Sequence, residues 1–248
     1  MARQAGEILR RGYGKEIQVS HKGEIDLVTE IDRLSESYLL GEIRSRFPGH
    51  RIICEESGVH AGSDCCLWYV DPLDGTVNYA HHIPIFTVSI AYEEDGRMLL
   101  GVVYDPLREE LFSAQRSTGA WLNGEPISVS NVQQLDTAML ATGFAYDIRT
   151  HPETNLDHFA HFSLRCQGVR RLGSAALDLC YVAAGRYDGF WELRLSPWDM
   201  AAGALIAQEA GARVTRIDGD LDFLTPPESI LAANPSLHAQ MLSILKPE

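Results

Sequence analysis

Hydrophobic residues recur at helical spacing over residues 31–47, which predicts an amphipathic helix that ends at Pro48 and Gly49. Short runs rich in β-branched and aromatic residues follow, and they predict strands at residues 51–54, 67–70, 87–92, 99–104 and 110–114. Asp95 and Gly96 separate two of these runs and predict a tight hairpin, because Gly accepts the positive φ of such a turn. The first half is therefore expected to be rich in antiparallel sheet, with helices beside it.

Beyond about residue 134 the pattern changes to strands that alternate with helices, which are expected at residues 175–184, 199–210 and 236–245. Such alternation is typical of an α/β arrangement. We therefore expect two parts, an α+β half at residues 1–134 and an α/β half at residues 135–248. The sequence between them is not of low complexity, so the halves are expected to share an interface.

The composition is that of a folded globular chain, since 45% of the 248 residues are hydrophobic and 22% are charged. The formal net charge of -13 disfavours binding to nucleic acid or to an anionic membrane through a basic patch. The N-terminal sequence does not resemble a signal peptide, and apolar runs stay short of the roughly 18 residues of a spanning helix. We therefore expect a cytoplasmic protein, whose five cysteines, without C-x-x-C spacing, are reduced core thiols.

Two carboxylates follow the run at residues 67–70, in the segment Asp71-Pro72-Leu73-Asp74-Gly75. Pro72 fixes φ, and Gly75 lets the backbone approach a ligand. The turn can therefore direct both carboxylates and the Leu73 carbonyl toward one point, where oxygen ligands suit a hard cation such as Mg²⁺. If a helix begins near Thr76, its free N–H groups face the same point and form an anion site.

Further acidic groups occur at three other places in the chain. Glu55 and Glu56 follow a predicted strand, Asp199 opens a predicted helix, and residues 26–32 carry several acids just after Lys22. Each group alone has an ordinary interpretation, because Asp is a common helix cap and paired acids are common in solvated turns. Their joint occurrence with Asp71 and Asp74 favours a functional site.

The segments at residues 26–32, 55–57, 71–78 and 198–211 resemble, in order and approximate spacing, the motifs of the inositol monophosphatase family of Mg²⁺-dependent phosphatases. The resemblance covers almost the whole chain, and residues 171–189 are similar to bacterial members. It implies a layered αβαβα sandwich of the inositol monophosphatase and fructose-1,6-bisphosphatase type. It also implies a lithium-sensitive phosphomonoesterase that acts with Mg²⁺ and forms a homodimer.

The resemblance implies two to three Mg²⁺ ions in the active site. Glu55, Asp71 and the Leu73 carbonyl are expected to hold one ion, and a third, weaker ion is expected near Glu55. Asp71, Asp74 and Asp199 are expected to hold the second ion, so that Asp71 bridges two ions. Two such ions can activate a water molecule and stabilise the leaving oxygen.

The resemblance also implies the remaining roles. Thr76 is expected to orient the attacking water, and Asp32 to accept a hydrogen bond from Thr76, so that both act with Glu55 as the base. Asp74 is expected to be catalytic through its charge. The residues expected to contact the substrate are Lys22, Asp74, Gly75, Thr76, Ala175, Glu192 and Asp199. Among these, the backbone N–H groups of Gly75 and Thr76 are expected to receive the phosphate.

Inositol 1-phosphate is the expected substrate, with inositol and phosphate as products. Fructose 1,6-bisphosphate, histidinol phosphate, NADP and 3′-phosphoadenosine nucleotides stay open, because related scaffolds act on them and the pocket wall decides. A phosphatase with an aspartyl nucleophile is disfavoured, since it needs a D-x-D pattern that Asp71 and Asp74 do not form. A non-catalytic Mg²⁺-binding regulatory module is the alternative from another class. The histidine pairs at residues 81–82 and 158–161 lack a third ligand at useful spacing, which disfavours zinc.

Overall fold

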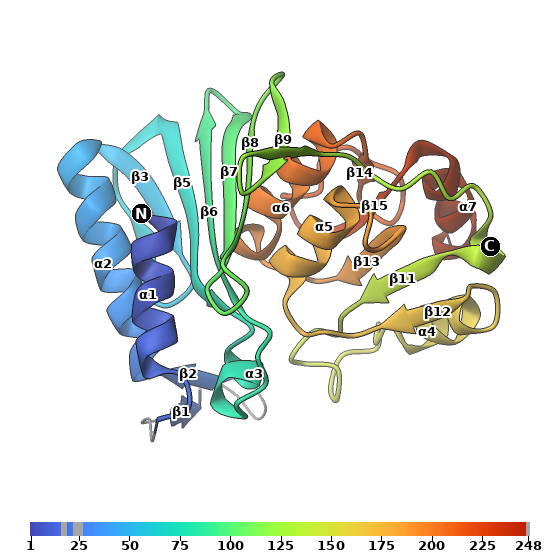
Figure 1. Ribbon diagram of the computed structural model, residues 1–248, viewed down its shortest axis with the longest axis horizontal. Helices are drawn as coiled ribbons and strands as arrows, with labels where there is room; N and C mark the ends of the chain where they lie inside the picture. Colours follow the sequence, from blue (N-terminus) through green and yellow to red (C-terminus); the bar gives the residue numbers. More distant parts are fainter. Residues whose placement is uncertain (16–18, 22–26, 247–248) are drawn as a thin grey trace.

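The computed structural model describes residues 1–15, 19–21 and 27–246, which form alternating layers of helices and sheets (Figure 1). From left to right in Figure 1, a helix pair, a large sheet, a second helix pair, a smaller sheet and a third helix pair follow one another. The helices of these pairs are α1 (Ala2–Gly12) and α2 (Glu30–Arg46), then α5 (Ala175–Ala183) and α6 (Pro197–Glu209), then α4 (Leu156–Ser163) and α7 (Pro235–Leu245). The predicted αβαβα sandwich is confirmed.

The large sheet has eight strands in the order β10-β9-β8-β7-β6-β5-β3-β4. Their bounds are β3 (His50–Cys54), β4 (Gly58–His60), β5 (Ser63–Asp74), β6 (Thr87–Glu94), β7 (Arg97–Asp105), β8 (Glu110–Gln115), β9 (Gly119–Leu122) and β10 (Glu125–Ile127). All neighbouring pairs are antiparallel except β3 and β5. Asp95 and Gly96 join β6 to β7 with φ of 49° and 71°, as the hairpin pattern predicts.

The smaller sheet has five strands in the order β12-β11-β13-β15-β14. Their bounds are β11 (Met139–Thr142), β12 (Gly168–Arg170), β13 (Gly189–Leu193), β14 (Arg213–Thr215) and β15 (Ser229–Ala233). β11 pairs in parallel with β12 and β13, and the other pairs are antiparallel. Short elements complete the described chain, namely β1 (Val19–His21), β2 (Leu27–Thr29), α3 (Thr76–Ala80) and the 3₁₀ turn η1 (Leu135–Thr137).

Reciprocal capping boxes fix the start of two helices that reach the candidate site. Thr29 caps α2, and the Asp32 carboxylate accepts a hydrogen bond from the Thr29 N–H at 2.9 Å. Ser196 caps α6, and the Asp199 carboxylate accepts from the Ser196 N–H at 2.7 Å. Asp199 is therefore the first-turn acid of α6, while the cap itself is Ser196.

The middle helix pair packs closely because small residues lie at its contacts. A Cβ on Gly203 of α6 would lie 2.7 Å from the Leu179 Cβ of α5. A Cβ on Gly101 of β7 would lie 2.7 Å from the Ala202 carbonyl oxygen. The largest hydrophobic core joins residues from both sheets and from α5 and α6, so the two halves share one interior. The division into domains near residue 134 stays a prediction.

Helices α1 and α4 lie where the hydrophobic pattern had predicted none. The buried face of α1 consists of small residues and a single leucine, and its charged residues lie on the opposite face, so the helical period is present although only one large apolar side chain carries it. A Cβ on Gly6 would meet the Tyr104 ring at 2.5 Å, which shows how closely α1 lies against the sheet. In α4 only Phe162 is fully buried. Both helices are stabilised by packing that the local pattern does not reveal.

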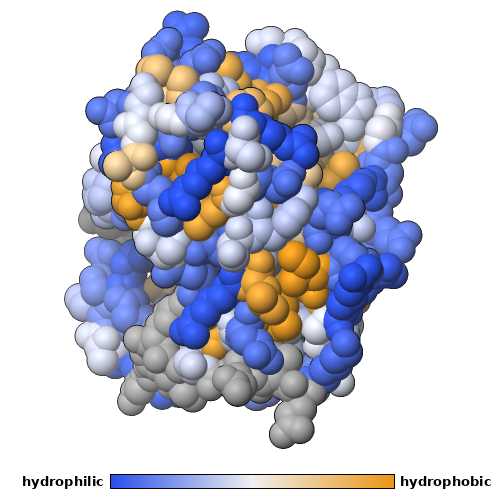
Figure 2. Space-filling view, turned by 90° about the vertical axis from the view of Figure 1, so that its left-hand side faces the viewer, coloured by the Kyte–Doolittle hydropathy of each residue, from blue (hydrophilic) through white to orange (hydrophobic). Residues whose placement is uncertain are grey.

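All five cysteines are free thiols, as expected. The prediction that the cysteines lie in the core is wrong for Cys65, which is exposed. Cys54 and Cys180 are buried. None of the helices in the described residues is both long enough and apolar enough to cross a membrane. Figure 2 shows the face that carries α1 and α2, where hydrophilic residues separate the hydrophobic groups from one another.

Candidate active site

A cavity of about 240 Å³ opens where the end of β5 meets the starts of α5 and α6 and the middle of β13. It brings together nine of the predicted site residues, namely Glu55, Asp71, Leu73, Asp74, Gly75, Thr76, Ala175, Glu192 and Asp199. Asp32 does not line this cavity and is buried behind Thr76. Lys22 lies outside the described residues.

An irregularity in β5 places the two carboxylates of the central motif. Asp71 pairs with Ser89 and Asp74 with Thr87, so one extra residue of β5 opposes β6 between these pairs. A β-bulge of this kind redirects side chains at the end of a strand. The Asp71 Oδ1 atom accepts from the Leu73 N–H at 2.9 Å, which holds the bulge from within.

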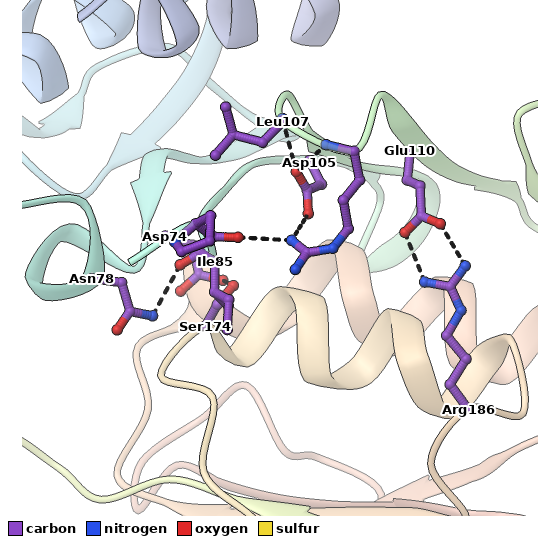
Figure 3. A network of polar contacts seen from close by, with 10 residues as sticks. Asp74, Asn78, Ile85, Asp105, Leu107, Glu110, Ser174 and Arg186 are labelled. Carbon is purple, nitrogen blue, oxygen red and sulfur yellow. Dashed lines mark hydrogen bonds and ion pairs between the residues drawn. The ribbon is translucent and has the colours of Figure 1, made fainter. Parts of the chain in front are cut away.

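The Asp74 carboxylate also caps the helix on the other side of the cavity. Its Oδ2 atom accepts from the Ser174 hydroxyl at 2.6 Å (Figure 3). The same atom accepts from the Ala176 N–H at 2.9 Å. These bonds satisfy an N-terminal donor of α5 and place a negative charge at the positive end of that helix. Asp74 therefore joins β5 to the second half of the chain.

Thr76 and Asp32 form a second buried contact beside the motif. The Thr76 hydroxyl lies 2.9 Å from the Asp32 Oδ1 atom and 3.0 Å from the Leu73 carbonyl oxygen, and it can donate its proton to either. The other oxygen of Asp32 accepts from the Thr29 N–H and hydroxyl. Asp32 is therefore fixed on both oxygens and holds Thr76 at the edge of the cavity.

Gly75 is required between the carboxylates and α3. Its φ is 96°, in the left-handed region that favours glycine. A Cβ there would lie 2.9 Å from the Ile85 carbonyl oxygen and 3.3 Å from the Gly173 carbonyl oxygen. Asn78 binds the same two loops, because its amide donates to the Ile85 carbonyl oxygen at 2.9 Å (Figure 3). The same amide donates to the Leu172 carbonyl oxygen at 2.8 Å.

Helix α2 supports the acidic loops from behind through polar residues that share one buried face with Asp32. The Ser35 hydroxyl donates to the Pro72 carbonyl oxygen at 2.9 Å. The Glu36 carboxylate accepts from the Glu56 N–H at 3.0 Å. Because residues three and four apart lie on one side of a helix, α2 orients three parts of the candidate site at once.

Several buried acids lie close together at this end of the cavity. Burial raises the pKa of Asp71, Asp74 and Asp199, and repulsion among these acids and Glu55 adds to the effect. The pKa of Asp74 rises only to about 6, because its bonds to Ser174 and Ala176 favour the charged form. For Asp71, burial is the largest cause, and repulsion from Glu55, Asp74 and Asp199 raises its pKa further.

These donors fit a divalent cation such as Mg²⁺. Carboxylate and carbonyl oxygens are the ligands of hard cations, and a cation would offset the repulsion among these acids. Among the described residues, no group of three or more His, Cys, Asp or Glu side chains is already arranged to hold a metal ion.

A different set of residues lines the cavity near β13. Burial raises the pKa of Glu192 to about 8, although the Arg171 guanidinium partly offsets this effect. The Glu192 carboxyl lies against the backbone of Gly143, where a Cβ would be 2.2 Å from its Oε2 atom. Ala175, at the first position of α5, completes this wall next to Glu192.

Comparison with known proteins places the chain among relatives along its whole length. The sequence model of the inositol monophosphatase family matches residues 1–247. The chain belongs to the inositol monophosphatase family. A curated family relative from Salmonella typhimurium, named Nus factor SuhB, is 43% identical over 100% of this chain and 93% of its own length.

Solved structures of inositol monophosphatase relatives have the same fold. The extragenic suppressor protein suhB from Bartonella henselae is 41% identical, with a TM-score of 0.93 over 99% of this chain and 95% of that one. An inositol monophosphatase from Anabaena is 44% identical, with a TM-score of 0.89 over 98% of this chain and 91% of that one. Membership and fold, both implied by the motifs, are confirmed.

Sequence analysis of this family member did not single out several residues of the cavity. Gly143 and Arg171 line it beside Glu192, and Ser174 binds Asp74. Asp178 lines it from α5. For Asp178 the sequence held a usable signal, since it is the only charged residue between Arg171 and Arg186. An isolated acid in an otherwise apolar helix indicates a buried polar role.

Proposed function

We propose that this chain is a Mg²⁺-dependent phosphomonoesterase that hydrolyses inositol 1-phosphate to inositol and phosphate. The observation that carries the proposal is the convergence of Glu55, Asp71, Asp74 and Asp199 on one cavity. Burial and mutual repulsion raise the pKa values of Asp71, Asp74 and Asp199, and membership of the inositol monophosphatase family supports the reaction class. Phosphate esters are anions, so a substrate would approach these acids only after cations neutralise them.

The proposed metal ligands divide into two sets that share Asp71. Glu55 and the Leu73 carbonyl would join Asp71 at one ion, and Asp74 and Asp199 would join it at another. A third, weaker ion near Glu55 completes the proposal of two to three ions. Bound Mg²⁺ would supply positive charge that activates a water molecule and stabilises the leaving oxygen.

Thr76 and Asp32 would orient the attacking water. When the Thr76 hydroxyl donates to Asp32, its lone pairs can accept a hydrogen bond from water in the cavity. Glu55 would accept the second hydrogen of that water. Together the three residues act as the proposed base, and Asp32 is held in place for this role by Thr29.

The proposed substrate site has a phosphate side and a leaving-group side. Backbone N–H groups of Gly75 and Thr76 would face the phosphate, beside Asp74. Ala175, Glu192 and Asp199 would contact the hydroxyl groups of the leaving alcohol. Lys22 stays a predicted phosphate contact.

The test is release of inorganic phosphate from inositol 1-phosphate, measured with Mg²⁺, with EDTA, and with Mg²⁺ plus lithium. We expect Mg²⁺-dependent release that lithium inhibits. Parallel assays with fructose 1,6-bisphosphate, histidinol phosphate, NADP and a 3′-phosphoadenosine nucleotide would identify a different substrate of the same chemistry. Absence of release from every ester, at any Mg²⁺ concentration, would contradict the proposal.

The name Nus factor carried by the curated relatives favours a second candidate, a non-catalytic role for this chain. That candidate predicts Mg²⁺ binding without turnover of any phosphate ester. The net charge of -13 supports partners other than nucleic acid.

We also propose that the chain is cytoplasmic and that it forms a homodimer. Sedimentation of the purified chain would test the homodimer.

A further inference from the structure

Asp178 is a buried acid of the cavity that the proposed mechanism does not use. It lies in the first turn of α5, three residues after Ala175. Residues three apart share a helix face, and both side chains line the cavity. Only 1% of Asp178 is exposed, so this residue lies at the buried end of the cavity.

One oxygen of the Asp178 carboxyl lacks the hydrogen bond that a buried polar atom normally makes. Its Oδ1 atom has no hydrogen-bond partner among the described residues. Other buried aspartates are bonded, since Asp74 accepts from Ser174 and Ala176, and Asp188 accepts from the Met139 N–H at 2.6 Å. A buried polar atom without a partner costs stability and indicates a missing ligand.

The surroundings of Asp178 suit a polar, uncharged ligand group. Glu192 and Asp74 repel its negative charge, while Arg171 attracts it, and burial raises its pKa above the usual range. A hydroxyl group can donate to such a carboxyl without bringing a charge into the cavity. Gly143 leaves space for the Glu192 carboxyl, so that two acids from different elements line this part of the cavity.

We propose that Asp178 accepts a hydrogen bond from a hydroxyl group on the leaving alcohol of a polyhydroxylated phosphate ester. The inference rests on the proposed phosphatase function and adds a specificity-determining residue to it. Asp178 favours cyclitol and sugar phosphates over esters whose leaving group carries no hydroxyl. The carboxyl is retained at a cost in stability because the bound substrate supplies its missing partner.

The experiment compares inositol 1-phosphate with p-nitrophenyl phosphate, whose leaving group carries no further hydroxyl. In Asp178→Ala, we expect kcat/KM for inositol 1-phosphate to fall about 10- to 100-fold, because one hydrogen bond is lost. We expect kcat/KM for p-nitrophenyl phosphate to stay within about twofold. Asp178→Asn keeps a carbonyl acceptor and is expected to retain most of the preference.

Thermal unfolding separates this role from a purely structural one. Removal of an unpaired buried acid is expected to raise the Tm of Asp178→Ala by about 2–4 °C. The matched control is Asp188→Ala, which removes a bonded buried aspartate away from the cavity. We expect it to lower the Tm and to leave the ratio of the two kcat/KM values unchanged.

Two results would overturn the proposed role of Asp178 and leave the proposed phosphatase function standing. Equal loss on both esters would make it a structural residue, and unchanged kinetics on both would mean that solvent water satisfies the carboxyl. A wild-type chain that hydrolyses neither ester would overturn the proposed function and this inference with it.

Discussion

Asp74 links two parts of the candidate site through one carboxylate. Its Oδ2 atom is held by Ser174 and Ala176 at the start of α5, and Thr87 lies 3.4 Å away. The Oδ1 atom is the oxygen that we expect to reach a cation. One residue thus orients the helix that carries Ala175 and Asp178 and supplies charge to the proposed metal site.

Replacement of Asp74 by Asn is expected to separate these two functions. An amide oxygen can still accept from Ser174 and Ala176, so the Tm should not fall. The negative charge is lost, and kcat should fall by about 10³-fold, which corresponds to about 4 kcal/mol of transition-state stabilisation. Steady-state kinetics with saturating Mg²⁺ measures this effect.

The control is Asp105→Asn, because Asp105 is equally buried but binds Arg108 and the Leu107 N–H outside the cavity (Figure 3). This variant should lose stability and keep its kcat. If Asp74→Asn turned over at a near-normal rate, Asp74 would have no catalytic role.

Helix α2 acts as the support for the acidic loops. Asp32, Ser35 and Glu36 are buried on one face and contact Thr76, the Pro72 carbonyl and the Glu56 N–H respectively. Such outer contacts orient metal ligands and adjust their affinity. The loop that carries Glu55 therefore depends on Glu36.

Loss of the Glu36 carboxylate is expected to weaken Mg²⁺ binding and to leave the rate of the chemical step largely unchanged. In Glu36→Ala, the Mg²⁺ concentration at half-maximal activity should rise about tenfold, while kcat at saturating Mg²⁺ is largely retained. Glu36→Gln should restore most of the affinity, because its amide oxygen can accept from the Glu56 N–H. The measurement is activity as a function of Mg²⁺ concentration.

Glu42→Ala is the matched control on the same helix, since Glu42 pairs with Arg46 at the surface. Its Mg²⁺ dependence should equal that of the wild type. An unchanged Mg²⁺ dependence in Glu36→Ala would show that α2 does not support the metal site through this contact.

Elements with strong periodic or turn signals could be predicted from the sequence. Helix α2, the hairpin at Asp95 and Gly96, and helices α5, α6 and α7 lie within two residues of the predicted bounds. Helix α1 also had a usable signal, because its charged and apolar residues lie on opposite faces, but its buried stripe holds only one large apolar side chain, Leu9. The site residues came from spaced motifs, whereas the contact of Glu192 with Gly143 depends on strands far apart in sequence.

Across the whole molecule, buried acids make stability depend on pH. Folding raises the pKa of Asp74 to about 6 and that of Glu192 to about 8. Between the ordinary carboxyl pKa of about 4 and these values, the folded chain holds protons that the unfolded chain has released. The stability of the metal-free chain is therefore expected to fall as pH rises from about 4 to 8.

Mg²⁺ should reverse this dependence, because only the deprotonated carboxylates bind it. We expect the increase in Tm caused by Mg²⁺ to be larger at pH 8 than at pH 6, relative to samples in EDTA. Thermal unfolding in matched buffers measures both effects. An equal increase at the two pH values would mean that Mg²⁺ binds away from these acids.

The central claim is that carboxylates distant in sequence hold shared divalent cations in one cavity. Anomalous diffraction from a crystal of the wild-type chain grown with Mn²⁺, a substitute for Mg²⁺, tests it most directly. The account predicts at least two peaks among Glu55, Asp71, Asp74 and Asp199, with Asp71 contacting both. A cavity without an anomalous peak, at Mn²⁺ concentrations that support phosphate release, would contradict it.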